Sequence, residues 1–152
     1  MMRSTAGRAI EIRKLGRGDA SVLANIAPDV FDEPVRPDLA QRFLETDSYR
    51  IFVALDGDLV VGMVTGFTHF HPDKEEQFFV NELGVDDAYL RQGIGMRLMQ
   101  AILAEARAMG CEEAWLGTEN SNAPALALYR KLMTEDDTAE PMWVFTYDLE
   151  DW

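Results

Sequence analysis

The segment Leu90–Leu98, LRQGIGMRL, places Gly93 and Gly95 one residue apart at the start of an apolar pattern with helical spacing. Glycine weakens a helix, so two glycines in a first turn need a reason. Without a Cβ, the backbone N–H groups at the positive end of a helix can approach an anion closely. The segment therefore predicts a phosphate-binding loop, although Gly-x-Gly also occurs in plain turns.

The sequence on both sides of this loop predicts a mixed α/β fold in one domain, residues 1–152. Asp56-Gly57-Asp58 joins two apolar runs and is typical of a tight hairpin turn, and Gly110 is expected to end the long helix. The first half should be mainly antiparallel, followed by a βαβ unit. Strands are expected at 8–15, 49–55, 59–70, 76–85, 112–119 and 142–150, and helices at 19–26, 38–44, 94–109 and 122–133.

Composition limits the class of protein. The formal net charge of −13 argues against nucleic acid or an anionic membrane as partner and tolerates a cationic one, although the same charge also serves solubility. The single cysteine excludes an internal disulfide. The start, MMRSTAGRAIEI, has no apolar stretch of signal-peptide length, and no apolar run approaches the length of a membrane span. A reduced, cytoplasmic protein is therefore expected.

Two segments beside the glycine loop resemble the GCN5-related N-acetyltransferase family. They are the strand NELGV before the loop and NSNAPALALYRKL after it, which contains the family pattern Asn-x-x-Ala-x-x-Leu-Tyr from Asn122 to Tyr129. The resemblance covers nearly the whole chain. It implies a mixed, mostly antiparallel sheet of six to seven strands flanked by about four helices, with acetyl-CoA as cosubstrate.

Two positions depart from the family pattern. The acetyl-CoA loop of the family has the form Gln/Arg-x-x-Gly-x-Gly/Ala, and Leu90 stands at its usual Gln or Arg. Met133 stands where many members have glycine. These changes put coenzyme affinity and the last hairpin in question, but a backbone phosphate site depends little on side-chain identity.

Within this family the chain is similar to the aminoglycoside 3-N-acetyltransferases of type I. The likeness lies in VFDEP, an acid before Leu on the central strand, RQGI, PALALYRKL and the ending Tyr-Asp-Leu-Glu at 147–150. It implies acetylation of the 3-amino group of an aminoglycoside, which is a form of antibiotic modification. Acetylation of a polyamine or a protein amine stays open, and so does a non-catalytic acyl-CoA-binding module.

The resemblance also implies roles for two ionisable side chains. Glu82 lies on a largely apolar strand and is the candidate general base; a structurally paired acid is the alternative. Tyr129 is the candidate acid for the departing thiolate, with a core aromatic as the alternative. A pure binding module would need neither group, so their joint presence favours an enzyme.

The remaining site residues follow from the same resemblance. The Val85 N–H is expected near the thioester carbonyl and the Leu83 backbone beside the pantetheine arm, with a strand bulge at Gly84. The implied coenzyme contacts are Leu83, Val85, Arg91, Gln92, Gly93, Ile94, Gly95, Met96 and Asn122.

The acceptor site is expected to be acidic. Asp32, Glu33 and Asp148 are candidates to flank a small cationic amine beside Glu82, although each alone also fits a solvated surface charge. His69 and His71 form a His-x-His pair without a third ligand at a fitting position, so no metal is expected. A homodimer is left open.

Overall fold

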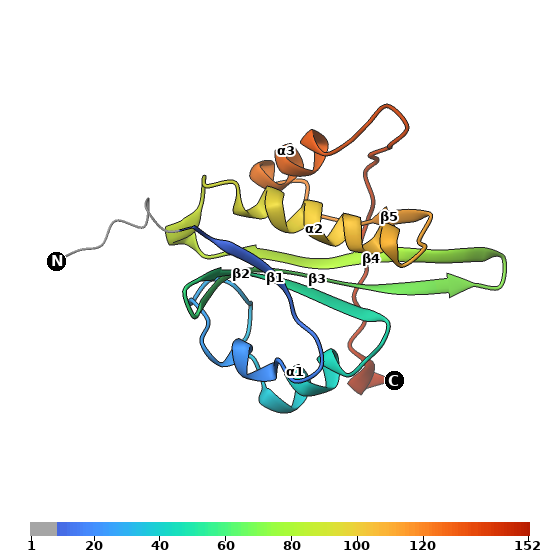
Figure 1. Ribbon diagram of the computed structural model, residues 1–152. Coiled ribbons are helices and arrows are strands. Elements are labelled where there is room, and N and C mark those ends of the chain that lie inside the picture. Colours follow the sequence, from blue (N-terminus) through green and yellow to red (C-terminus); the bar gives the residue numbers. More distant parts are fainter. Residues whose placement is uncertain (1–8) are drawn as a thin grey trace. The chain divides into compact units, whose positions relative to one another are not determined.

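The computed structural model describes residues 9–152, which form two compact units: the part ending at Leu116 and the part Gly117–Trp152 (Figure 1). The first unit contains the sheet. The second contains α3, Ala123–Lys131, and a 3₁₀ turn at Leu149–Asp151. A single domain over 1–152 stays a prediction.

The sheet has five strands in the order β1-β2-β3-β4-β5. The first four are antiparallel to their neighbours, and β5 runs parallel to β4. Gly57 has a φ of 61°, which fits the tight turn expected between β2 and β3. The mixed, mostly antiparallel sheet is therefore confirmed. Its strands are β1 Glu11–Lys14, β2 Tyr49–Asp56, β3 Leu59–His71, β4 Lys74–Val85 and β5 Glu113–Trp115.

Helices cover both faces of the sheet in the first unit. The long helix α2, Ile94–Ala108, lies over one face, and α1, Pro37–Leu44, lies on the other side (Figure 1). The apolar side of α2 packs on the central strands, where Gly62 leaves room for Leu98 and Ile94. No helix within residues 9–152 is long and apolar enough to cross a membrane. The largest fully buried side chains are Phe78, Met63, Ile94, Leu98, Met99, Ile102, Val53, Val60, Val61 and Val64.

Several expected elements are shorter or absent. The structure has five strands and three α-helices within residues 9–152, where six to seven and about four were expected. The expected strand at 142–150 is not formed in that part of the chain: its apolar side chains are exposed and no strand pairs with it. An alternating pattern makes a segment suitable for a strand, but the ladder needs a neighbour.

The first helix and the first strand also differ from expectation. A 3₁₀ helix spans only Ala20–Ala24, where a helix over 19–26 with Asp19 as its cap was expected. The Asp19 carboxylate makes no cap bond and instead accepts a hydrogen bond of 2.8 Å from the Gly16 N–H. The strand expected at 8–15 is observed from Glu11, and residue 8 lies outside the described residues.

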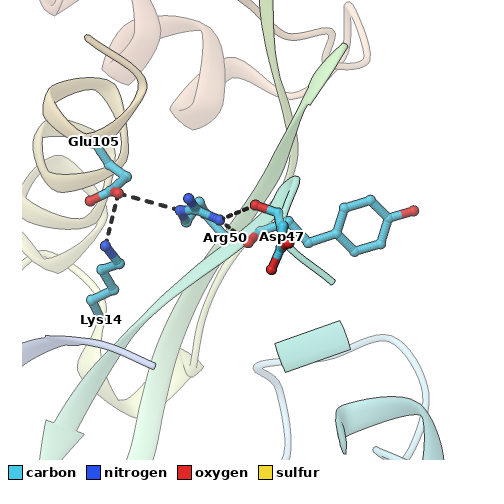
Figure 2. Close-up of polar contacts among 5 residues, drawn as sticks. Lys14, Asp47, Arg50 and Glu105 are labelled. Atoms are coloured by element: carbon cyan, nitrogen blue, oxygen red, sulfur yellow. Dashed lines mark hydrogen bonds and ion pairs between the residues drawn. The ribbon is translucent and has the colours of Figure 1, made fainter. Parts of the chain in front are cut away.

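An ion-pair cluster fastens α2 to the sheet edge (Figure 2). The Glu105 carboxylate accepts hydrogen bonds from Lys14 Nζ of β1 at 2.8 Å and Arg50 Nε of β2 at 3.3 Å. Arg50 also donates to the Asp47 carbonyl at 2.6 Å. Burial alone would raise the pKa of Glu105, whose side chain is 16% exposed, but the two cations outweigh it and lower the pKa.

We expect Glu105→Gln to lower the free energy of unfolding at pH 7 by about 1–2 kcal/mol, because it leaves two cations without their common partner. A lowered folded-state pKa stabilises the fold above the ordinary pKa of about 4.3 and loses that effect as pH falls through the folded value. The difference between wild type and variant in urea unfolding should therefore shrink below about pH 4. The exposed Glu112→Gln is the control, and an equal loss in that variant would contradict the assignment.

Candidate active site

The end of β4 carries the candidate base on an irregular stretch of strand. Thr65 of β3 pairs with Glu82 and the next residue, Gly66, pairs with Val80, so Asn81 is the extra residue of a bulge. The bulge expected at Gly84 was therefore misplaced, since Gly84 pairs in register with Met63. Glycine is required at 84 for another reason: a Cβ there would collide with the Val30 carbonyl oxygen.

Beyond the bulge, β4 presents an unpaired backbone edge. Within residues 9–116, β5 pairs with β4 only at Gln77–Phe79. The Asp86 N–H donates to the Val61 carbonyl at 2.9 Å, toward β3. Because backbone direction alternates along a strand, the N–H and C=O groups of Leu83 and Val85 point to the opposite, unpaired edge. These two backbones can accept an extended ligand as a further strand would.

The loop after Ala27 is held against the same end of β4. The buried Asp86 carboxylate accepts hydrogen bonds of 3.2 Å from the N–H groups of Asp29 and Ala88. Sequence reasoning missed this role of Asp86, although an acid directly after a strand is a common start of a turn. The contact places the VFDEP loop, with Asp32 and Glu33 exposed, beside β4.

Glu82 is exposed to solvent, but its carboxyl has a perturbed pKa. Partial burial raises the pKa of its carboxyl, and the negative charge of Asp32 raises it further. Glu82 and Asp32 are therefore near enough for their negative charges to interact. Glu33 follows Asp32 on the exposed loop. A carboxylate with a raised pKa binds a proton more readily and suits a general base.

The N-terminus of α2 has the geometry of an anion-binding loop. Arg91 and Gly93 have φ values of 63° and 76°, in the left-handed region. Gly93 gives no side-chain cap, and Arg97 N–H makes the first bond of the helix, to the Gly93 carbonyl at 3.1 Å. The helix itself therefore offers no partner to the N–H groups of Ile94, Gly95 and Met96.

Side-chain space is open above this loop. A Cβ on Gly93 would meet no atom within 4 Å, so packing does not require glycine there. Glycine is favoured because of the left-handed backbone conformation. Arg91 and Gln92 are exposed, whereas the Ile94 side chain is buried and can offer only its backbone. These N–H groups at the positive helix end fit a pyrophosphate, so the residues present suit acetyl-CoA.

Three predicted site residues lie in the second unit. Asn122 accepts a hydrogen bond of 3.2 Å from the Ala125 N–H and caps α3. Asp148 is exposed and accepts from the Glu150 N–H at 3.0 Å. Burial raises the pKa of Tyr129, which keeps its phenol protonated at neutral pH. Their relation to Glu82 stays a prediction.

A cavity of about 320 Å³ lies at a different part of the first unit. Its lining includes Lys14, Arg50, Phe43 and Tyr49, and none of the predicted site residues. The cations Lys14 and Arg50 are already engaged by Glu105. The chemistry of β4 and α2 therefore locates the candidate site better than cavity size does.

Known proteins with similar sequences are N-acetyltransferases. The chain is 31% identical to the N-alpha-acetyltransferase RimI of Mycobacterium tuberculosis over 125 residues, covering 81% of this chain and 77% of that protein. It is 38% identical to the mycothiol acetyltransferase of Segniliparus rotundus over 104 residues, but spans only 38% of that protein.

Solved structures share the fold at lower identity. An aminoglycoside acetyltransferase from an uncultured soil metagenomic sample, in complex with sisomicin, superposes with a TM-score of 0.73 and 22% identity, covering 91% of this chain and 97% of that one. Residues 20–133 match the acetyltransferase (GNAT) family. The chain belongs to this family and is an N-acetyltransferase.

Proposed function

We propose that the chain moves an acetyl group from acetyl-CoA directly to a primary amine, with Glu82 as general base. The observation that carries this proposal is a carboxyl with a raised pKa at the end of β4. That strand also presents an unpaired backbone edge, and the anion-binding end of α2 follows it after eight residues. Acetyl-CoA supplies the thioester, and the chain supplies the groups that bind it, the general base and the acid.

The backbone supports a specific placement of the coenzyme. The N–H groups from Gln92 to Met96 would hold the pyrophosphate, with Arg91 adding positive charge. The edge groups of Leu83 and Val85 would bind the pantetheine arm, and the Val85 N–H would polarise the thioester carbonyl. In this proposal Asn122 contributes from the second unit.

Glu82 has two tasks in this proposal. As a carboxylate it attracts the ammonium form of the acceptor, and it then takes the proton that the amine must lose before it attacks. Asp32, Glu33 and Asp148 add negative charge around the acceptor. Tyr129, protonated at neutral pH, would give a proton to the departing thiolate.

The acceptor is a small cationic amine, and two classes have separate support. The resemblance of the sequence to the aminoglycoside 3-N-acetyltransferases of type I supports the 3-amino group of an aminoglycoside, and the solved aminoglycoside acetyltransferases share the fold. The relative RimI is an N-alpha-acetyltransferase, which supports a protein or peptide amine. These relatives favour an enzyme over a non-catalytic acyl-CoA-binding module.

Release of free CoA from acetyl-CoA tests the proposal. We expect purified protein to release CoA at least tenfold above the background hydrolysis rate with one or more amines in a panel of gentamicin, sisomicin, spermidine and short peptides. Mass spectrometry should show one added acetyl group on the amine. Binding of acetyl-CoA without acetylation of any amine would contradict the proposal.

A further inference from the structure

Four aromatic side chains form a row across the sheet, one on each of the strands β2 to β5. They are Tyr49, Phe67, Phe79 and Trp115, here called the aromatic row. Ring centroids are 5.6 Å apart for Tyr49 and Phe67, 5.4 Å for Phe67 and Phe79, and 4.3 Å for Phe79 and Trp115. The row is continuous because these residues are paired in the strand register.

The aromatic row lies on the face of the sheet that carries Glu82. Glu82 pairs directly with Thr65, and Phe67 follows Thr65 by two residues on β3. Residues two apart on a strand share a face and lie about 7 Å apart. The opposite face holds the buried Phe78, which takes part in the core under α2. Phe67 on β3 and Phe79 on β4 are therefore each one side-chain step from the Thr65–Glu82 pair, and the Trp115 ring packs on Phe79.

The aromatic row is accessible to solvent, unlike the buried Phe78. Tyr49 is 41% and Trp115 43% exposed, and Phe67 and Phe79 are half-buried. Exposed aromatic rings on the sheet face that carries Glu82 offer an apolar surface with a negative end. The complementary molecule has a positive end and an apolar or aromatic arm.

We propose that the acceptor is an amine with an aromatic group, whose ammonium lies at Glu82 and whose ring packs on the aromatic row. This inference rests on the proposed function and narrows its substrate class. Such a ring occurs in a free arylalkylamine and in a peptide with phenylalanine at its N-terminus. Both have the ammonium within two or three bonds of the ring, close enough to span one strand step.

Paired amines test the preference. We expect kcat/KM for phenethylamine to exceed that for propylamine at least tenfold, or kcat/KM for the peptide Phe-Gly-Gly to exceed that for Gly-Gly-Gly by the same factor. The better of the two aromatic substrates shows whether the acceptor is a free arylalkylamine or a peptide. Trp115→Ala should raise KM about tenfold for the aromatic amine and leave KM for its aliphatic partner and for acetyl-CoA within twofold. Trp115→Phe keeps a ring and should retain most of the preference.

Phe70→Ala is the matched control, because Phe70 is 71% exposed and lies on the other face of β3. It should leave the preference unchanged. Equal kcat/KM values for aromatic and aliphatic amines in the wild type would overturn the inference and leave the proposed function intact. An equal effect of Trp115→Ala on both amines would overturn the inference as well.

Binding measured without acetyl-CoA separates the two proposals. Calorimetry should show that phenethylamine binds the wild type at least fivefold more tightly than it binds Trp115→Ala. If this holds while no amine releases CoA, the aromatic site stands and the proposed reaction fails. If phenethylamine binds both proteins equally, the aromatic row is not the acceptor site.

Discussion

Gly95→Val is expected to weaken acetyl-CoA binding at least 100-fold while the protein still folds. The N–H groups of Ile94, Gly95 and Met96 lack partners from the helix, and the proposal requires a pyrophosphate to approach them. A branched side chain in this turn would hold the phosphates away from the backbone. Valine forms helices better than glycine, so the free energy of unfolding should not fall by more than about 1 kcal/mol.

Calorimetry with acetyl-CoA measures this effect, and circular dichroism confirms the fold. Gly95→Ala is the matched control, since the family pattern accepts Ala at this position and a methyl group leaves the N–H groups accessible. It should bind acetyl-CoA within about threefold of the wild type. Unchanged affinity in folded Gly95→Val would remove the loop from the coenzyme site.

Local sequence signals predicted the helix that follows this loop and the hairpin between β2 and β3. The periodic apolar residues and Gly110 predicted α2 to within one residue, and Asp56-Gly57-Asp58 predicted the hairpin. Both signals act within a few residues, so no tertiary information was needed. The acid on a largely apolar strand, together with the family resemblance, pointed to Glu82 as the candidate base, and that role stays a prediction.

Features that depend on pairing were not predictable in the same way. The resemblance implied a bulge at Gly84, but the strand register places the bulge at Asn81. The collision of a Cβ at position 84 with the Val30 carbonyl oxygen explains the glycine. The strand expected at 142–150 lacks a neighbour within residues 9–152, which no local pattern reveals. The aromatic row was not predictable for the same reason. Its neighbouring members are 12 to 36 residues apart in sequence and meet only through the register of four strands.

The proximity of Asp32 and Glu82 lies between these cases. Both residues were expected at one acceptor site, and the negative charge of Asp32 is among the causes of the raised pKa of Glu82. The contact that brings them together runs through Asp86, whose carboxylate binds the Asp29 N–H. A buried acid with a structural role has no distinctive sequence pattern, so the role of Asp86 was not predicted.

Glu82→Gln should lower kcat/KM for the acceptor amine about 100- to 1000-fold at neutral pH, because it removes both the charge that attracts the ammonium and the base that deprotonates it. Affinity for acetyl-CoA should stay within twofold. Folding should not suffer: the folded state favours the protonated carboxyl, since its pKa is raised, so ionised Glu82 opposes stability at neutral pH. Glu75→Gln, on the exposed start of β4, is the control and should keep full activity.

The pH dependence separates the base from a mere binding charge. Wild-type kcat/KM should rise as pH increases through the raised pKa of Glu82, whereas the variant should recover only in part, at higher pH, where the amine loses its proton unaided. Asp32→Asn removes a charge that raises this pKa, so it should move the acidic limb of the wild-type profile to lower pH. An unshifted limb in Asp32→Asn, or full neutral-pH activity in Glu82→Gln, would show that Glu82 is not the base and return it to the role of a structural acid.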